Sequence, residues 1–178
     1  MLDELMRIGV ELRFEKARKC LQAAEAMIAI EAFADSANRS YYSIFHAMQA
    51  LLTTGGFSSK THSGSIAEFR KKYIKTGIFP KQYSDILRDA FQVRNKSDYD
   101  IYYIVVKSEV VQQIENAKIF LSGIETYIKA LMDIVDYEKT QAKLTLMSEI
   151  AKGEKAGREN GWLTIEEVEF GDSLQNED

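Results

Sequence analysis

The sequence predicts an all-α fold, an antiparallel bundle of four to five helices, from two observations. The chain of 178 residues contains one proline, Pro80. Proline clashes inside helices but is common in loops and at sheet edges, so its near absence favours long uninterrupted helices. Apolar residues also recur every three or four positions along most of the chain, which is the spacing of one helix face.

The first half of the chain predicts two long helices and a loop. The apolar repeat indicates a first helix over residues 2–31 and a second that begins near Asp35. Aspartate is a common residue at a helix start because its carboxylate accepts from free backbone N–H groups. The second helix should end at Gly55, where glycine permits the left-handed backbone of helix ends. Residues 57–64 are polar and are expected to form a loop.

The second half predicts two shorter helices, a connector and a long helix. A helical pattern over residues 66–76 is followed by Pro80, which suits the first turn of a helix over residues 81–93. Residues 101–106 have strand propensity but no partner strand in the sequence, so we expect an extended connector. The last long helix should begin at Ser108.

The chain is expected to divide into a helical bundle over residues 1–136 and a second segment over residues 137–178. The second segment begins as a helical extension and ends as an acidic C-terminal tail. Trp162 and Leu163 are its candidate partner-binding residues, since a tryptophan is a frequent anchor at protein interfaces. The alternative is that both side chains pack on the bundle or on a second copy.

Composition limits the class of protein. The chain has 23 lysines and arginines against 27 aspartates and glutamates, a formal net charge of −4, which disfavours a general nucleic-acid coat but permits a local basic site. Its one cysteine, Cys20, excludes an intramolecular disulfide and favours a cytoplasmic protein. The sequence has no apolar run of membrane-spanning length, no zinc-ligand spacing and no phosphate-binding loop, so we expect no membrane segment, metal or cofactor.

A first group of candidate site residues lies on the second predicted helix. Arg39 and His46 are seven positions apart, about 700° of helical rotation, and therefore share one face. Tyr42 lies between them. A guanidinium, a phenol and an imidazole on one stripe can bind a phosphate and move a proton. Alternatively, the stripe faces neighbouring helices and the three side chains are structural.

Two further groups carry polar side chains. His62 lies in the expected loop, and Arg94, Asn95, Asp98 and Tyr99 lie together where the fourth helical pattern ends. If that helix continues, Arg94 and Asp98 are one turn apart and can form an ion pair. That pair either shapes the exit from the helix or belongs to a binding site.

These groups together resemble a prokaryotic HEPN domain. The resemblance rests on residues 37–42 (ANRSYY), 60–64 (KTHSG) and 94–99 (RNKSDY), in this order among helices. It covers roughly residues 12–131. It implies a small helical bundle, often a homodimer, that occurs in toxin–antitoxin systems and is often paired with a nucleotidyltransferase-like protein or an antitoxin.

The resemblance also implies chemistry. Many HEPN proteins are metal-independent ribonucleases whose signature is an arginine followed, after about four to six residues, by a histidine. This chain departs from that signature, because Asp98 or Tyr99 holds the histidine position after Arg94 and no histidine follows His62. A tyrosine is a poor base at neutral pH and an unperturbed carboxylate is a poor acid.

The leading functional prediction is therefore an RNA-binding, nucleotide-binding or interaction module, the HEPN half of a toxin–antitoxin-like pair. One alternative is an active ribonuclease that uses Arg39, His46 and Arg94. Another is a purely structural partner protein whose tail binds a neighbour. The candidate RNA- or phosphate-binding residues are Arg94, Asn95, Asp98, Tyr99, Arg39, Tyr42, His46 and His62.

Overall fold

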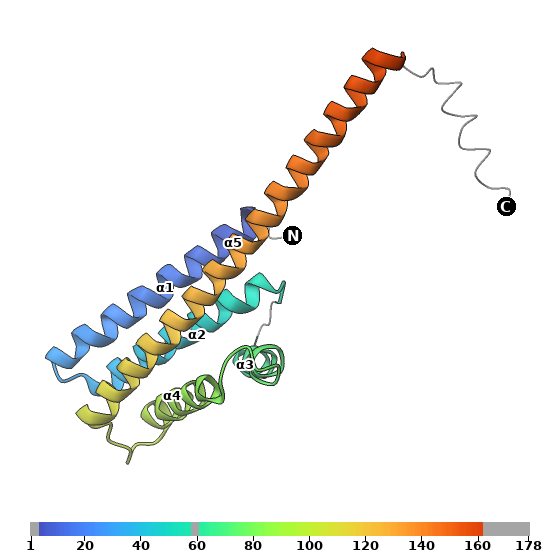
Figure 1. Cartoon of the computed structure of the whole chain (residues 1–178). Coiled ribbons are helices and arrows are strands. Elements are labelled where there is room, and N and C mark those ends of the chain that lie inside the picture. The colour runs from blue at the N-terminus through green and yellow to red at the C-terminus, as the bar shows by residue number, and fades with distance from the viewer. Residues whose placement is uncertain (1–3, 58–60, 162–178) are drawn as a thin grey trace. The chain divides into compact units, whose positions relative to one another are not determined.

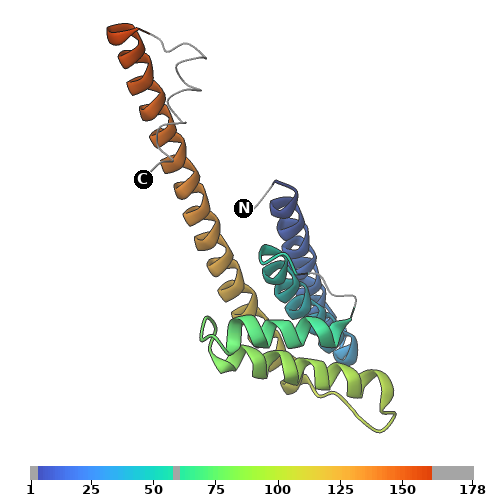
Figure 2. The same cartoon turned by 90° about the vertical axis from the view of Figure 1, so that its right-hand side faces the viewer.

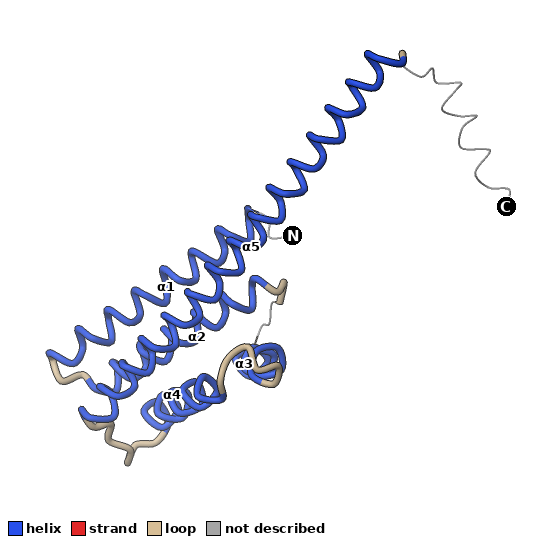
Figure 3. Tube along the Cα trace, viewed as in Figure 1, coloured by secondary structure: helices blue, strands red, loops and turns tan. Residues whose placement is uncertain are grey.

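The computed structural model describes residues 4–57 and 61–161, and every regular element in these ranges is a helix (Figure 3). The elements are α1 (Glu4–Ala29), α2 (Phe33–Thr54), α3 (His62–Phe69), the π-helix η1 (Arg70–Ile74), α4 (Lys81–Tyr99) and α5 (Lys107–Asn160). The all-α prediction is confirmed. Within the described ranges, no helix combines the length and apolar character needed to span a bilayer.

The chain divides into two units, Met1–Met132 and Asp133–Asp178, and α5 contributes to both. In the first unit α1, α2 and the first part of α5 are aligned with one another (Figure 1). The turned view shows α3 and α4 side by side and running across that layer (Figure 2). In the second unit, residues 133–160 form the last part of α5.

The core of the first unit is rich in aromatic side chains. Phe120 of α5 is fully buried, and its ring centroid lies 5.8 Å from that of Phe69 and 5.2 Å from that of Tyr83. Each buried aromatic side chain removes a large apolar area from water, which is the main stabilising contribution to such a fold. The largest fully buried hydrophobic side chains are Tyr41, Phe69, Phe120, Ile44, Met48, Leu51, Leu87, Ile124 and Val110.

Two buried serines on α2 fix its alignment with α1. The Ser36 hydroxyl donates to the carbonyl of Ala24 at 2.6 Å, and the Ser43 hydroxyl donates to the carbonyl of Ala17 at 2.8 Å. The donors are two turns apart on α2 and the acceptors are two turns apart on α1, in the opposite order that an antiparallel pair requires. Both hydroxyls are thus satisfied without water.

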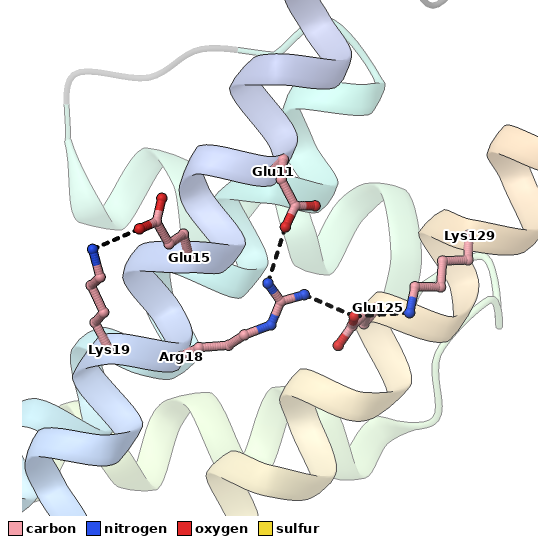
Figure 4. A network of polar contacts seen from close by, with 6 residues as sticks. All are labelled: Glu11, Glu15, Arg18, Lys19, Glu125 and Lys129. Carbon is pink, nitrogen blue, oxygen red and sulfur yellow. Dashed lines mark hydrogen bonds and ion pairs between the residues drawn. The ribbon is translucent and has the colours of Figure 1, made fainter.

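An ion-pair network connects α1 to α5 at the surface (Figure 4). The Arg18 guanidinium lies 3.0 Å from a Glu11 oxygen and 2.8 Å from a Glu125 oxygen, and Lys129 lies 3.0 Å from the same Glu125 oxygen. Hydrogen bonding to Lys129, with a further contribution from Arg18, lowers the pKa of Glu125. Because the network is partly solvated, each pair stabilises the fold by at most about 1 kcal/mol.

Two helix ends differ from the sequence prediction at places that matter for function. The structure has α4 continuing through residues 95–98 to Tyr99, because Ser97 donates to the Val93 carbonyl and the polar run supports a last helical turn. It also places His62 as the first residue of α3 rather than in a loop. Thr61 caps this helix by accepting from the Gly64 N–H at 3.1 Å.

The other element bounds differ less. Helix α2 begins at Phe33 rather than near Asp35, and Gly56, with φ of 69°, takes the left-handed conformation expected at its end. Helix α5 begins at Lys107 and continues to Asn160. The extended connector over residues 101–106 contains no strand, as predicted. The candidate tail residues Trp162 and Leu163 lie outside the described residues.

Replacing Gly123 with alanine is expected to lower the free energy of unfolding by about 1–3 kcal/mol, measured by urea denaturation. A Cβ at this position of α5 would lie 1.8 Å from the Tyr83 hydroxyl oxygen. The Tyr83 ring has little freedom to move, because its centroid lies 4.8 Å from that of Phe79 and 5.2 Å from that of Phe120. The steric cost should exceed the gain of about 1 kcal/mol in helix propensity.

A second substitution tests the cause. Tyr83→Phe removes the oxygen that the new methyl group meets, so it should restore part of the stability lost in Gly123→Ala. If Gly123→Ala alone stabilises the protein, the close approach of α5 to Tyr83 is wrong.

Candidate functional site

Arg94 is held by its own helix and is linked through Asp98 to α2. One terminal nitrogen of its guanidinium lies 2.8 Å from an Asp98 oxygen, and the other donates to the Asn95 side-chain oxygen at 3.1 Å. Asn38 of α2 donates to the second Asp98 oxygen at 3.3 Å. The guanidinium carbon lies 5.9 Å from the centroid of the Tyr99 ring. Arg94 and Asp98 are thus one turn apart, as the sequence suggested for a continued helix.

His62 lies at the N-terminus of α3 against the aromatic side chains of α2. Its Nδ1 is 2.9 Å from the Tyr41 hydroxyl oxygen, and its ring stacks on Phe45 with centroids 4.0 Å apart. The Tyr42 ring approaches it edge-on at 6.2 Å. Partial burial, with a contribution from the nearby charge of Arg94, lowers the pKa of His62. The imidazole is therefore neutral at pH 7 although the residue as a whole is exposed.

Tyr41 supports His62 from inside the core. Burial raises the pKa of Tyr41 to about 12, although the charge of Arg94 acts in the opposite direction. The phenol therefore stays protonated and can exchange one hydrogen bond with His62. In the tautomer that carries a proton on Nδ1, the ring donates to the Tyr41 oxygen and Nε2 is left as a proton acceptor.

His46 lies one turn after Tyr42 on α2, with the two ring centroids 6.2 Å apart. Burial lowers the pKa of His46, and the charges of Lys16 and Arg13 on α1 lower it further. A hydrogen bond with Gln49 opposes this shift. His46 Nδ1 is buried and has no hydrogen-bond partner among the described residues. His46 is thus also neutral at pH 7, and two of the charges that act on it belong to α1.

Arg39 lies at the α1 side of the same stripe. It hydrogen-bonds Cys20 of α1, and this contact and its charge counteract the rise that burial causes in the pKa of the thiol. Its side chain is exposed. The structure therefore groups Arg94 with His62, whereas Arg39 contacts α1.

The predicted site residues fall into two adjoining groups on one region of the first unit. Arg94, Asn95, Asp98 and Tyr99 form the α4 group, and the rings of Tyr42, His46 and His62 form the α2–α3 group. The charge of Arg94 acts on His62 and so connects the groups. Arg13, Lys16 and Arg94 bring positive charge to this region, and Asp98 neutralises part of it by pairing with Arg94.

Sequence reasoning missed four contributors. Tyr41 and Phe45 hold His62, and their signal was present, since both lie within one turn of Tyr42 in the aromatic segment of α2. Arg13 and Lys16 act on His46 from α1, and no local pattern indicates this, because it depends on how α1 packs.

The described residues contain no cluster of three or more histidine, cysteine, aspartate or glutamate side chains that could bind a metal.

Comparison with known proteins agrees with this arrangement of helices. Residues 10–127 match the HEPN domain family. A UPF0332 protein of Thermotoga maritima is 32% identical over 68% of this chain and 92% of its own length. One from Archaeoglobus fulgidus is 34% identical over 67% of this chain and 91% of its own length. A Methanocaldococcus jannaschii protein named "Putative toxin MJ0142" is 32% identical over 67% of this chain and 81% of its own length. The match covers most of the chain and all three motifs, and the chain therefore belongs to the HEPN domain family.

Proposed function

We propose that this protein is the toxin-like HEPN half of a toxin–antitoxin-like pair and that it binds RNA through the region around Arg94 and His62. Two relatives from Methanocaldococcus jannaschii are named "Putative toxin MJ0142" and "Putative toxin MJ0605", which supports the first part. The second part rests on the geometry of this chain.

One observation carries the RNA-binding proposal: the neutral imidazole of His62 lies among aromatic rings, and the charge of the Arg94 guanidinium acts on it. Arg94 can bind a phosphate oxygen through charge-assisted hydrogen bonds, and the exposed ring of Tyr99 offers a face on which a base can stack. Single-stranded RNA offers both groups at neighbouring positions. A free nucleotide carries one base and its own phosphate, so it should compete with RNA for the site.

Asp98 limits the affinity that this site can reach. In the free protein its carboxylate already pairs with Arg94, with 2.8 Å between the charged atoms. A phosphate must share or displace that partner, so the net gain from Arg94 is smaller than for an unpaired arginine. We expect binding to be salt-dependent, because each bound phosphate releases condensed counterions.

The binding test compares two arginines of α4. Arg94→Gln is expected to weaken binding of a fluorescent single-stranded RNA about tenfold and to reduce the salt slope by about one, since one phosphate contact is lost. Arg88→Gln is the matched control, because Arg88 lies on the same helix and pairs with Asp85 and Asp89 at the surface. Equal affinity of wild type and Arg94→Gln, or no binding by wild type, contradicts the proposal.

The partner half of the proposal concerns an antitoxin or a nucleotidyltransferase-like protein. Trp162 and Leu163 remain the sequence-based candidates for its contact. Trp162→Ala should weaken capture of a co-expressed partner encoded beside this protein, while RNA binding by the purified chain stays unchanged. If Trp162→Ala still captures the partner, the tail is not part of the interface. A purely structural role of this chain would require, in addition, that the protein does not bind RNA.

A second candidate function is metal-independent RNA cleavage. The observation that favours it is that the charge of Arg94 acts on the imidazole of His62, so α3 supplies a histidine that the sequence lacks after Arg94. In this reaction His62 Nε2 takes the proton of a ribose 2′-OH, and the oxygen attacks the adjacent phosphorus. Arg94 stabilises the added negative charge, and the 5′-oxygen leaves with a proton from a water molecule, giving a 2′,3′-cyclic phosphate. The hydroxide formed from that water then takes the proton from His62 and restores the neutral imidazole.

A further inference from the structure

Residues 134–151 of α5 carry an uncharged face. We call this face the α5 seam. It consists of Ile134, Tyr137, Thr140, Gln141, Leu144, Met147, Ser148 and Ala151. At 3.6 residues per turn these eight positions fall within an arc of about 140°, and the acids and bases between Ile134 and Ala151 lie outside it. All of its side chains are exposed, including Leu144 at 55% and Met147 at 56%.

The spacing of the α5 seam is that of a coiled coil. Tyr137, Leu144 and Ala151 follow one another at seven-residue intervals, and Thr140 and Met147 fill the second core position of each heptad. Gln141 directly follows Thr140, and Ser148 directly follows Met147, so both flank the core of the heptad repeat. A helix with this repeat buries its face best against another helix that has the same repeat.

Charge argues for a second copy of this chain as the partner helix. Residues 133–160 carry six acids and five bases, so two identical helices meet with almost no net repulsion. Three of the bases are already paired along the helix, with Lys152–Glu149, Arg158–Glu154 and Lys155–Glu159 separations of 2.8, 3.6 and 3.8 Å. A partner selected by strong opposite charge would find little to bind, whereas a two-fold pair needs only the shared uncharged face.

The seam is an addition to the family domain, because the HEPN match ends at residue 127 and the curated relatives cover about two thirds of the chain. Helix α5 already extends through the seam in the single chain. Association therefore costs little additional backbone ordering, which usually opposes the pairing of short helices. The seam spans about 26 Å, long enough for roughly two and a half heptads.

We propose that the α5 seam is a dimerisation surface that pairs with the same segment of a second copy as a short coiled coil. The proposal does not depend on RNA binding. Because the heptads are few and include polar side chains, association should be of moderate strength, in the micromolar range.

The test uses two leucines of the same helix in the full-length chain. Leu144 lies at the centre of the seam, whereas Leu146 lies about 200° further around the helix and is equally exposed, at 60%. Sedimentation equilibrium should show that the wild-type protein forms dimers. The dissociation constant of the dimer should be at least about tenfold higher in Leu144→Lys. Leu146→Lys should retain the wild-type constant. Both substitutions are at exposed sites, and circular dichroism confirms that the helices are intact.

Three results would overturn the proposal. A wild-type protein that stays monomeric up to a few hundred micromolar has no such pairing. Unchanged association in Leu144→Lys places any dimer contact elsewhere, and equal loss in both variants means that added charge rather than the seam determines association. Binding of a different protein by monomeric wild type, lost in Leu144→Lys, would assign the seam to that partner instead.

Discussion

Replacing Phe120 with alanine is expected to lower the free energy of unfolding by about 3–5 kcal/mol. The Phe120 ring is fully buried between the rings of Phe69 and Tyr83, which come from different helices. Alanine would leave a cavity that three helices would have to close together, so little of the lost contact energy can be recovered. Chemical denaturation monitored by circular dichroism measures the change.

The neighbouring residue provides the control. Ile119 is 46% exposed, so Ile119→Ala removes a side chain of similar apolar character from a partly solvated site. Its effect should stay within about 1 kcal/mol. Similar losses in the two variants would mean that Phe120 does not lie in the core.

For the cleavage function, His62→Gln is expected to reduce the rate of RNA cleavage in a chelator-containing buffer by at least about 100-fold. Glutamine can still hydrogen-bond Tyr41, but it cannot accept the 2′-OH proton. Cleavage is measured on a short labelled RNA whose product carries a 2′,3′-cyclic phosphate. His46→Gln is the comparison, because His46 is the other histidine of the region and Arg94 is not among the charges that shift its pKa. A smaller loss than in His62→Gln is expected, and a larger one would assign the base to His46.

The pH dependence follows from the direction of the pKa shift. The pKa of His62 is lowered from its usual value of 6.5, so the reactive neutral ring becomes populated as pH rises through a midpoint below 6.5. Because the unfolded chain binds more protons than the folded one in this range, stability also rises with pH there. Intact RNA after incubation with wild type would exclude cleavage and leave RNA binding to be judged by Arg94→Gln alone.

The fold was predictable because helix periodicity and the position of Pro80 are local signals. The bounds of α4 were not, because residues 95–98 are polar and resemble a loop in isolation. In the structure Ser97 donates to the Val93 carbonyl and Arg94 pairs with Asp98, and these contacts exist only if the helix continues. Serine, asparagine and aspartate side chains can form hydrogen bonds that end a helix or bonds within a continuing helix. Composition alone therefore does not decide whether the helix continues.

For the candidate site, contacts within one helix were predictable from the sequence, but contacts between helices were not. Arg94 and Asp98 were expected one turn apart on a continued helix, and the structure has them so. The association of Arg94 with His62 instead of His46 depends on where α3 begins relative to α2, which Thr61 sets by capping the helix at His62. Contacts between elements distant in sequence carry no periodic signal, so neither this pairing nor the influence of α1 on His46 could be derived beforehand.

The serine contacts between α1 and α2 have a consequence for ligand binding. Ser36 and Ser43 join the two helices at points two turns apart, so α1 cannot slide or rotate along α2 without breaking both bonds. Lys16 immediately precedes Ala17, one of the two acceptor residues on α1, and its charge acts on His46. The backbone position from which Lys16 acts on the imidazole is thus fixed when the chain folds. If the proposed RNA binding is correct, an RNA phosphate would meet a charge whose attachment point is already in place.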